Sequence, residues 1–401
     1  MSRRRKVNTA LAEGMPDLYN SFKMKILIVT TGYPRDESDI SGIFIQRLAK
    51  AMVRGGAEVT VLAPGDRDAP HRERKHGIRV VRFPYAPRCL MRLAYGVGGI
   101  PENLRRRPYL GLLLPFFSGS LFFHTLRLAG TCDVVHAQWL MTGAAAWPAA
   151  KLRKRPILVT LRGLDVRKRL SGFRLWILKR LDGVATVNRQ WTEVLRSDLR
   201  IPVFYVPNGV EVGPTSPNDP HPPRTLEIVR VLSVGTLCLR KGTDILAAAA
   251  RRMMTESPNI RLFVAGPGDP REFGLDGMAN IRYLGLIPPQ DVLELYRDYD
   301  IFILPSRHEG RPNALLEAMA SGLPCVATRL PGVTEVLTEE CGIIIPVEDP
   351  NALAGAIRTL VRDPDLRKRM GERAKARIAE LSLTWDASAA KYLEVFHDFP
   401  S

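Results

Sequence analysis

The sequence predicts an α/β protein built from two doubly wound domains, each with a parallel sheet. Its 401 residues exceed what one compact core normally contains, so two domains of ordinary size are expected. Its composition, 45% hydrophobic and 25% charged residues, is that of a globular chain. In both halves short apolar runs alternate with amphipathic helical patterns, and this alternation is typical of βαβ units.

The first domain is expected over residues 24–209. A buried strand at 26–30 leads through a loop to a helix at 43–54, and a second strand follows at 58–63. Apolar residues recur at helical spacing within 43–54, and Gly55-Gly56 ends the helix. Further strands are expected at 80–83, 134–136, 157–160 and 183–187, and residues 204–209 close the domain.

The second domain is expected over residues 226–382, after a linker at 210–225 that is rich in Pro and Asn. Its predicted strands lie at 228–235, 261–266, 281–284, 301–304 and 325–327. Its predicted helices lie at 314–320, 351–362 and 364–381. Residues 1–23 form a basic tail that we expect to be disordered, and Met24 is an alternative start immediately before the first strand.

The charge of the chain is unevenly distributed. Residues 1–200 hold 36 Lys and Arg against 15 Asp and Glu, a net charge of +21, whereas residues 201–401 hold 22 against 26, a net charge of −4. The basic half indicates an anionic partner, for which membrane phospholipid, nucleic acid and a phosphorylated acceptor qualify. A solvated basic surface is the simpler alternative. The five cysteines are dispersed, which argues against a disulfide framework and suits a reducing cytosol.

Residues 110–123 form an apolar stretch that arginines flank. Gly111, Pro115 and Gly119 are expected to break it, and its 14 residues are fewer than the roughly 20 needed to cross a bilayer. Apolar residues beside arginines suit docking onto an anionic membrane surface. A buried helical hairpin with a solvated rim is an equally good interpretation.

The most informative segment lies between Asp300 and Thr328. A short apolar strand ends at Pro305, a loop follows, and Pro312-Asn313 opens a helix whose first amides are free. A helix start behind the carboxyl end of a parallel strand is an anion site suited to phosphate. Glu309 just before the helix and Glu317 within it add carboxylates suited to binding hydroxyls. The combination predicts a nucleotide-sugar site, although two glutamates eight residues apart also occur by chance on α/β surfaces.

Residues 309–324 resemble the two-glutamate signature of retaining glycosyltransferases of family 4, which have the GT-B fold. The resemblance extends over roughly residues 25–399. It implies two Rossmann-like domains that face each other across a cleft, the first for the acceptor and the second for the nucleotide-sugar donor. It also implies a C-terminal helix, here within 383–401, that crosses back to the first domain.

In the first domain the resemblance assigns Gly42 to the loop near the donor phosphates. His136 and Gln138 match the family's Asp-x-x-His-x-His segment, with Gln138 in place of the second histidine. Arg162 and Asp165 match a His-Gly-x-Asp turn, with Arg162 in place of the histidine. Gln138, Arg162 and Asp165 are therefore assigned to the acceptor or to a phosphate. A structural role for His136 and a turn-capping role for Asp165 remain open.

In the second domain, residues 235–242 resemble the family's pyrophosphate-binding segment. Gly235 and Lys241 match, Thr236 replaces an arginine, and Arg240 or Arg162 is the expected substitute cation. The resemblance thus implies catalytic roles for Glu309, Lys241, Arg240 and His136. The donor-binding residues that it implies are Gly42, Gly235, Lys241, Gly266, Glu309, Arg311, Pro312, Asn313, Ala314, Leu315 and Glu317. Glu309 would hold sugar hydroxyls, Glu317 the ribose, and neither metal nor cofactor is implied.

The favoured hypothesis is a retaining, metal-independent transferase that moves a sugar from a nucleotide sugar to a lipid-linked or saccharide acceptor. Such an enzyme would serve cell-surface polysaccharide or glycolipid synthesis and be cytoplasmic, peripheral on the inner face of the membrane. A GT-B-shaped nucleotide-sugar epimerase is the alternative enzyme class. Nucleic-acid binding, suggested by a pI near 10.0, is disfavoured because no basic and aromatic interleaving is visible. A dehydrogenase is disfavoured because no Gly-x-Gly-x-x-Gly follows the first strand.

Overall fold

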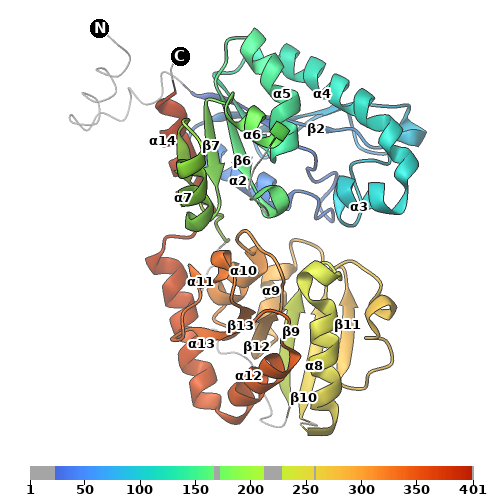
Figure 1. Ribbon diagram of the computed structural model, residues 1–401, viewed down its shortest axis with the longest axis vertical. Coiled ribbons are helices and arrows are strands. Elements are labelled where there is room, and N and C mark those ends of the chain that lie inside the picture. The colour runs from blue at the N-terminus through green and yellow to red at the C-terminus, as the bar shows by residue number, and fades with distance from the viewer. Residues whose placement is uncertain (1–22, 167–171, 212–227, 257–258, 400–401) are drawn as a thin grey trace, which may run out of the picture.

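Two parallel sheets, one above the other along the longest axis, organise the molecule (Figure 1). The computed structural model describes residues 23–166, 172–211, 228–256 and 259–399. The basic tail and most of the predicted linker lie outside the described residues, so those two assignments stay predictions. Both sheets have helices on their two faces, as the alternating sequence pattern predicts.

The first sheet has eight strands in the order β3-β4-β2-β1-β5-β6-β7-β8, and only β3 runs antiparallel to its neighbour. The strands are β1 (Lys25–Val29), β2 (Glu58–Pro64), β3 (Arg72–Lys75), β4 (Ile78–Phe83), β5 (Val134–Gln138), β6 (Ile157–Leu161), β7 (Gly183–Thr186) and β8 (Val203–Tyr205). The strand order reverses between β1 and β5. The loops after these two strands therefore border a crevice, the usual ligand position in such sheets.

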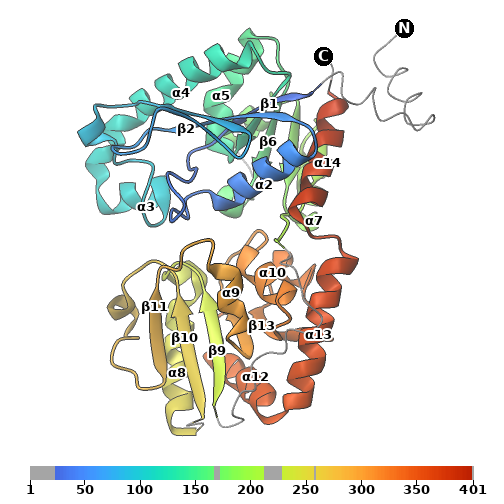
Figure 2. The same ribbon diagram turned by 180° about the vertical axis from the view of Figure 1, so that it is seen from behind.

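Successive side chains of β1 point to opposite faces of the first sheet. Ile26 and Ile28 pack with α2 (Ile43–Arg54) and α14 (Trp385–His397) on one face (Figure 2). Leu27 and Val29 pack against the opposite helix layer. The other helical segments of this domain are η2 (Arg88–Leu90), α3 (Gly99–Arg106), η3 (Pro108–Leu113), α4 (Leu114–Ala129), α5 (Leu140–Leu152), η4 (Gly163–Val166), α6 (Gly172–Leu178) and α7 (Arg189–Asp198).

The second sheet has six parallel strands in the order β11-β10-β9-β12-β13-β14, and its order reverses between β9 and β12. The strands are β9 (Val229–Val234), β10 (Ile260–Ala265), β11 (Ile281–Gly285), β12 (Ile301–Leu304), β13 (Cys325–Thr328) and β14 (Gly342–Ile345). The helical segments are η5 (Leu239–Lys241), α8 (Thr243–Glu256), η6 (Pro270–Phe273), α9 (Val292–Arg297), α10 (Asn313–Ala320), α11 (Pro331–Thr334), α12 (Pro350–Arg362) and α13 (Pro364–Glu380).

The expected C-terminal crossing helix is confirmed as α14. Ser388 on α14 donates a 2.6 Å hydrogen bond to the Pro207 carbonyl of the first domain. The chain leaves and re-enters this domain at one place, where Val210 bridges Thr384 and its amide donates to the Leu383 carbonyl at 2.9 Å. At that crossing a Cβ on Gly209 would lie 2.2 Å from the Thr384 carbonyl carbon, so no side chain fits.

The crossing helix also covers His136 on β5. The imidazole lies 4.6 Å from the Tyr392 ring and 5.4 Å from the Phe396 ring, measured between centroids. Its Nε2 is 2.8 Å from Thr160 Oγ1, which in turn is 2.9 Å from the Tyr392 hydroxyl. Complete burial, assisted by the Arg162 charge, lowers the pKa of His136 to about 3. The imidazole is therefore neutral at physiological pH.

Several predicted elements match the structure closely, and two strands were missed. The helix expected at 43–54 has those bounds in α2, and the strands that carry the site are all present. The missed strands are β14 and β3; the sequence of β3, Arg-Glu-Arg-Lys, contains no apolar residue. Such a strand pairs at a sheet edge through its backbone, which hydrophobic periodicity does not detect.

The expected break within residues 110–123 was wrong. Pro115 occupies the first turn of α4, where its missing amide costs nothing, and η3 leads directly into α4. Pro108–Ala129 thus forms a continuous helical segment of 22 residues with a mean hydropathy of 1.4, long and apolar enough to span a bilayer by those two measures. One side of α4 nevertheless packs into the domain core through Phe117, Leu121 and Ala129.

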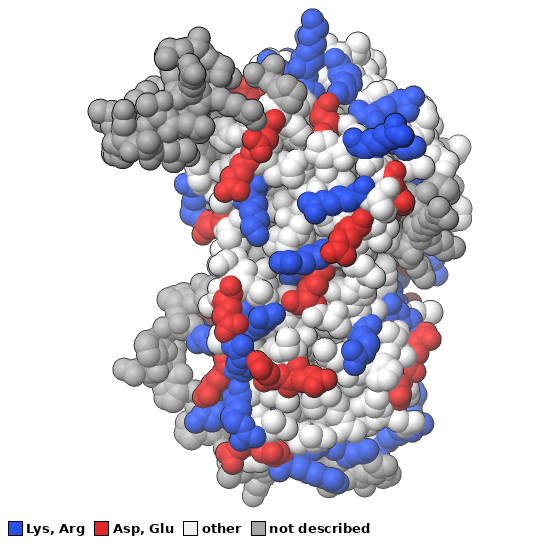
Figure 3. All heavy atoms as spheres, turned by 60° about the vertical axis from the view of Figure 1, so that its left-hand side comes forward, with Lys and Arg blue, Asp and Glu red and all other residues white. Residues whose placement is uncertain are grey.

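The face that bears α7, α13 and α14 intersperses Lys and Arg with Asp and Glu (Figure 3). One exposed ion pair joins α2 to α14, where Arg54 lies 2.6 Å from Asp386. Both side chains are more than half exposed, and pairs of this kind contribute little to stability. The junction between α14 and the first domain therefore depends on its buried contacts.

We expect Gly209→Ala to destabilise the protein by about 1–3 kcal/mol, because the new methyl group overlaps the Thr384 backbone. Gly355→Ala is the matched control, since a Cβ there has no neighbour within 4 Å and lies inside α12. That control should gain about 0.5–1 kcal/mol from helix propensity. Urea unfolding curves measure both, and equal stability of the two variants would contradict the close packing at the crossing.

His136 makes stability depend on pH. Its native pKa is about 3 and its unfolded pKa is near 6.5, so between these values only the unfolded chain takes up the proton. The free energy of unfolding therefore keeps its full value above about pH 6.5 as far as His136 is concerned. It falls at lower pH, by about 2 kcal/mol between pH 7 and pH 5. Urea unfolding of wild type and His136→Asn at both pH values tests it. Identical pH dependence in the two proteins would refute the assignment.

Candidate active site

A lysine–glutamate pair, with the glutamate buried and the lysine partly buried, joins the two loops that border the crevice of the second sheet. Lys241, at the end of η5 after β9, places its Nζ 2.6 Å from Oε1 of Glu309, which follows β12. Ser306 donates a 2.8 Å hydrogen bond to the same oxygen. Gly242 allows this approach: it has φ 71°, and a Cβ there would lie 1.9 Å from the Pro305 carbonyl oxygen. The predicted catalytic pair is thus brought together by the reversal of strand order.

The electrostatic environment keeps Glu309 ionised. Burial opposes the charge and would raise the pKa of Glu309, but Lys241 and Arg240 outweigh it, together with hydrogen bonds from Lys241 and Ser306. The pKa is lowered as a result. Arg240 lies on the same turn and its Nη1 is 3.5 Å from the His308 carbonyl. Two cations and one carboxylate therefore lie beside the start of α10, whose free amides attract anions.

Glu317 is also buried, and its main partner comes from the other domain. Arg47 on α2 places Nη1 2.7 Å from Glu317 Oε1, while the Tyr296 hydroxyl donates to Oε2 at 3.1 Å. Sequence reasoning missed Arg47, although a signal was present. The arginine falls among the apolar positions of α2, next to Leu48, where a charge is costly unless it has a buried partner.

Three of the predicted donor-site glycines lie where backbones approach closely. Gly42 has φ 69°, and a Cβ there would come within 2.2 Å of the Gly32 carbonyl oxygen. Gly266 has φ 136°, and its Cβ would lie 2.0 Å from the Gly235 carbonyl oxygen. A Cβ on Gly235 would meet the methylenes of Lys241 at 3.6 Å. The loop after β1 is therefore packed to backbone contact within itself, and the loops after β9 and β10 are packed to backbone contact with each other.

The predicted acceptor residues form one buried hydrogen-bonded network. Arg162 donates through Nε to Gln138 Oε1 at 3.0 Å, and the Gln138 amide nitrogen lies 3.0 Å from His136 Nε2. The other end of the guanidinium bonds Asn208, whose amide donates to Asn313 Oδ1 at 2.9 Å. The two departures from the family pattern are therefore partners, since the Gln138 carbonyl accepts from Arg162 while its amide faces His136. The network reaches the first residue of α10 in the other domain.

Asp165 lies in the turn after β6 and caps it. Its Oδ2 accepts a 3.0 Å hydrogen bond from the Arg162 amide. Burial raises the pKa of Asp165 to about 6, although hydrogen bonds from the Arg162 and Leu140 amides act in the opposite direction. These contacts favour the turn-capping interpretation that the sequence left open.

Arg311 directs its guanidinium into a contact between the domains. It donates to the Val187 carbonyl at 2.9 Å and to the Tyr205 hydroxyl at 2.8 Å, and it pairs with Glu335. Its predicted part in donor binding thus has no geometric support beyond its place in the motif. Pro312 is the residue before α10, and Asn313, Ala314 and Leu315 form the first turn whose amides are free.

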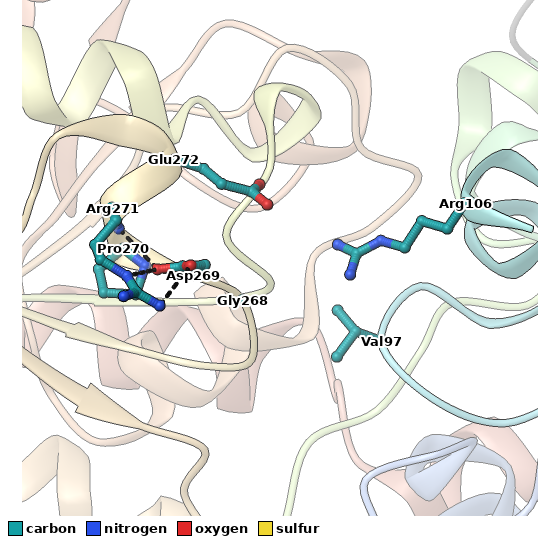
Figure 4. Close-up of a pocket in the computed structure, with 7 residues that line it drawn as sticks. All are labelled: Val97, Arg106, Gly268, Asp269, Pro270, Arg271 and Glu272. Carbon is teal, nitrogen blue, oxygen red and sulfur yellow. Dashed lines mark hydrogen bonds and ion pairs between the residues drawn. The ribbon is translucent and has the colours of Figure 1, made fainter.

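Further contacts close the domains near the two glutamates. His308 Nε2 lies 3.0 Å from the Gly163 carbonyl, and Asn188 donates to the Gly310 carbonyl at 2.9 Å. The open part of the cleft, about 520 Å³, lies to the side, between Val97 and Arg106 of the first domain and residues 268–272 of the second (Figure 4). It adjoins the glycine loop after β10, but neither Lys241 nor Glu309 lines it. Among the described residues no cluster of His, Cys, Asp or Glu could hold a metal ion.

Comparison with known families divides the chain in the same way. The glycosyl transferase 4-like domain matches residues 41–209, and the glycosyl transferases group 1 domain matches residues 229–363. Together the two matches cover most of the chain. The first match contains every strand of the first sheet except β1 and ends beside the crossing at Val210, and the second match contains all six strands of the second sheet.

Relatives and solved structures extend along nearly the whole chain. The D-inositol 3-phosphate glycosyltransferase of Xylanimonas cellulosilytica is 27% identical over 88% of this chain and 90% of that protein. The enzyme of the same name from Corynebacterium glutamicum is 28% identical over 86% and 92%. Sucrose-phosphate synthase of Thermosynechococcus elongatus, 23% identical, superposes with a TM-score of 0.75 over 94% of this chain and 98% of that chain. Anabaena HepE with UDP and glucose, 18% identical, gives 0.69 over 94% and 100%, and these two likenesses show the fold. The chain belongs to the group 1, family-4-like glycosyltransferases of GT-B fold, and it is a nucleotide-sugar-dependent glycosyltransferase.

Proposed function

We propose that this enzyme transfers a hexose from a UDP-sugar, with retention of configuration and without a metal, to a hydroxyl of a lipid-linked or saccharide acceptor. The observation that carries the proposal is the pairing of Lys241 with the buried Glu309 just before α10, whose first amides are free. Anabaena HepE, which shares the fold, has been solved with UDP-glucose, and this supports uracil as the base of the donor nucleotide.

The charges match those that develop when a sugar leaves a nucleoside diphosphate. The departing diphosphate gains negative charge, which Lys241, Arg240 and the amides of Asn313–Leu315 would stabilise. Glu309, held ionised, accepts hydrogen bonds from hydroxyls of the sugar and fixes its orientation. The acceptor hydroxyl transfers its proton to a departing phosphate oxygen, so no protein side chain need serve as base.

The acceptor side of the cleft is cationic. Arg162 introduces a guanidinium where the family pattern has a histidine, and it is positioned by Gln138 and Asn208. The relatives are named for transfer to D-inositol 3-phosphate, an acceptor with a phosphate group. We therefore infer an anionic acceptor, whose phosphate or carboxylate would lie near Arg162.

Transfer to candidate acceptors from a panel of UDP-, GDP- and ADP-sugars tests this proposal. Lys241→Ala and Glu309→Gln should each lower kcat about 10²–10³-fold, since both groups act on charge or orientation in the transition state. Lys375→Ala on α13, an exposed lysine remote from these loops, is the matched control and should keep wild-type kcat. NMR of the product reads the anomeric configuration. Inversion, donor epimerisation without acceptor, or full activity of both site variants would refute the proposal.

The Arg47–Glu317 pair generates a separate prediction for nucleotide binding. If Glu317 holds the ribose, UDP must displace Arg47 from its carboxylate, so Arg47→Gln should tighten UDP binding several-fold, about fivefold for ~1 kcal/mol. Glu317→Gln should weaken it, because the hydroxyls lose a charged acceptor. Isothermal titration calorimetry measures both. Equal weakening in the two variants would instead make Arg47 a ligand of the nucleotide.

A further inference from the structure

The continuous helical segment formed by η3 and α4 is apolar on two sides, and only one of these sides packs against the rest of the domain. Phe117, Leu121 and Ala129 face the core of the first domain. On the other side an outer stripe is formed by Tyr109, Leu112, Phe116 and Phe123, which are 65%, 77%, 66% and 67% exposed. Their spacing of three, four and seven residues places them along one line of the helix. Exposed apolar rows of this size indicate an interaction surface.

The charge around the outer stripe has a single sign. Residues 103–132 contain four arginines and no Asp or Glu. Arg105, Arg106 and Arg107 precede the stripe and Arg127 follows Phe123 by one turn, all of them exposed. Glu102 pairs with Arg105 and Arg106 at 2.7 and 2.6 Å, whereas Arg107 and Arg127 form no ion pair with the described residues.

We propose that the outer stripe and its flanking arginines form a docking surface for an anionic lipid bilayer. Aromatic and aliphatic side chains would enter the boundary between headgroups and acyl chains, and the arginines would contact lipid phosphates. The exposed apolar side chains and the unopposed arginines that such a bilayer requires both lie within residues 103–132. A protein partner would require the apolar side chains but not the absence of acidic residues.

The position of this surface suits the reaction. α3 lies between α4 and the cleft at the outer edge of the molecule (Figures 1 and 2). Arg106, at the end of α3, lines the open part of the cleft opposite Glu272 (Figure 4). A bilayer in contact with the outer stripe would therefore lie near the open side of the cleft, where a lipid-linked acceptor can enter. This last step rests on the proposed function, but the docking surface itself does not.

Vesicle flotation of the full chain tests the docking surface. Wild type should float with phosphatidylcholine vesicles that contain phosphatidylglycerol, bind pure phosphatidylcholine much more weakly, and be released by salt. The double variant Leu112→Ser, Phe116→Ser should bind the anionic vesicles at least about tenfold more weakly. Arg107→Gln should weaken binding roughly fivefold. Met254→Ser on α8, an exposed apolar residue of the second domain, is the matched control and should float like wild type.

Two results would overturn the inference. One is failure of the wild type to float with anionic vesicles, or equal flotation of the double variant. The other is a dimer in analytical ultracentrifugation that dissociates in the double variant, which would assign the stripe to a second copy of the chain. UDP release with a water-soluble acceptor should be unchanged in the double variant. If the wild type releases no UDP with any such acceptor, the result counts against the proposed function and leaves the docking surface unaffected.

Discussion

Two carboxylates are buried at the cleft, and the structure there depends on the contacts that offset the electrostatic cost of removing them from water. Glu309 and Glu317 are each less than a tenth exposed, and an ionised carboxylate in such a place requires a cation and hydrogen bonds. Glu309 obtains them within its own domain, from Lys241 and Ser306. Glu317 obtains them partly from Arg47 across the cleft. The first pair lies within the second domain, while the second pair links the two domains.

Strand order explains why residues distant in sequence meet at the cleft. In each sheet the order reverses once between two adjacent strands, β1 and β5 in the first and β9 and β12 in the second. The loops after β1, β9 and β12 carry Gly42, Lys241 and Glu309, and the neighbouring loops after β6 and β10 add Arg162, Asp165 and Gly266. The chain therefore needs few long loops to assemble a cleft. Backbone contacts at Gly242 and Gly266 then fix how closely the loops approach.

The sequence predicted the two sheets, the crossing helix and the Lys241–Glu309 region, because apolar periodicity and Pro–Gly punctuation are local signals. It failed where structure depends on partners. The charged strand β3 is stabilised by its neighbour β4, and Pro115 is harmless because it opens a helix. Arg311 makes its contacts between the domains, and its predicted part in donor binding stays a prediction. A charge among the apolar positions of α2 indicates that Arg47 needs a buried partner, but local pattern does not identify that partner as Glu317, 270 residues away.

The crossing helix restricts how the domains of this protein can be exchanged with those of another. Because α14 packs on the first sheet, the second domain is topologically an insertion between Val210 and Leu383, held at both of its junctions by one backbone pairing. A chimaera that exchanges donor specificity must therefore replace an internal segment and keep the native C-terminus. Simple fusion of two halves at the linker would leave His136 beneath a foreign helix. Exchange of the second domain therefore requires that two junctions, at Val210 and at Leu383, both fit the first domain.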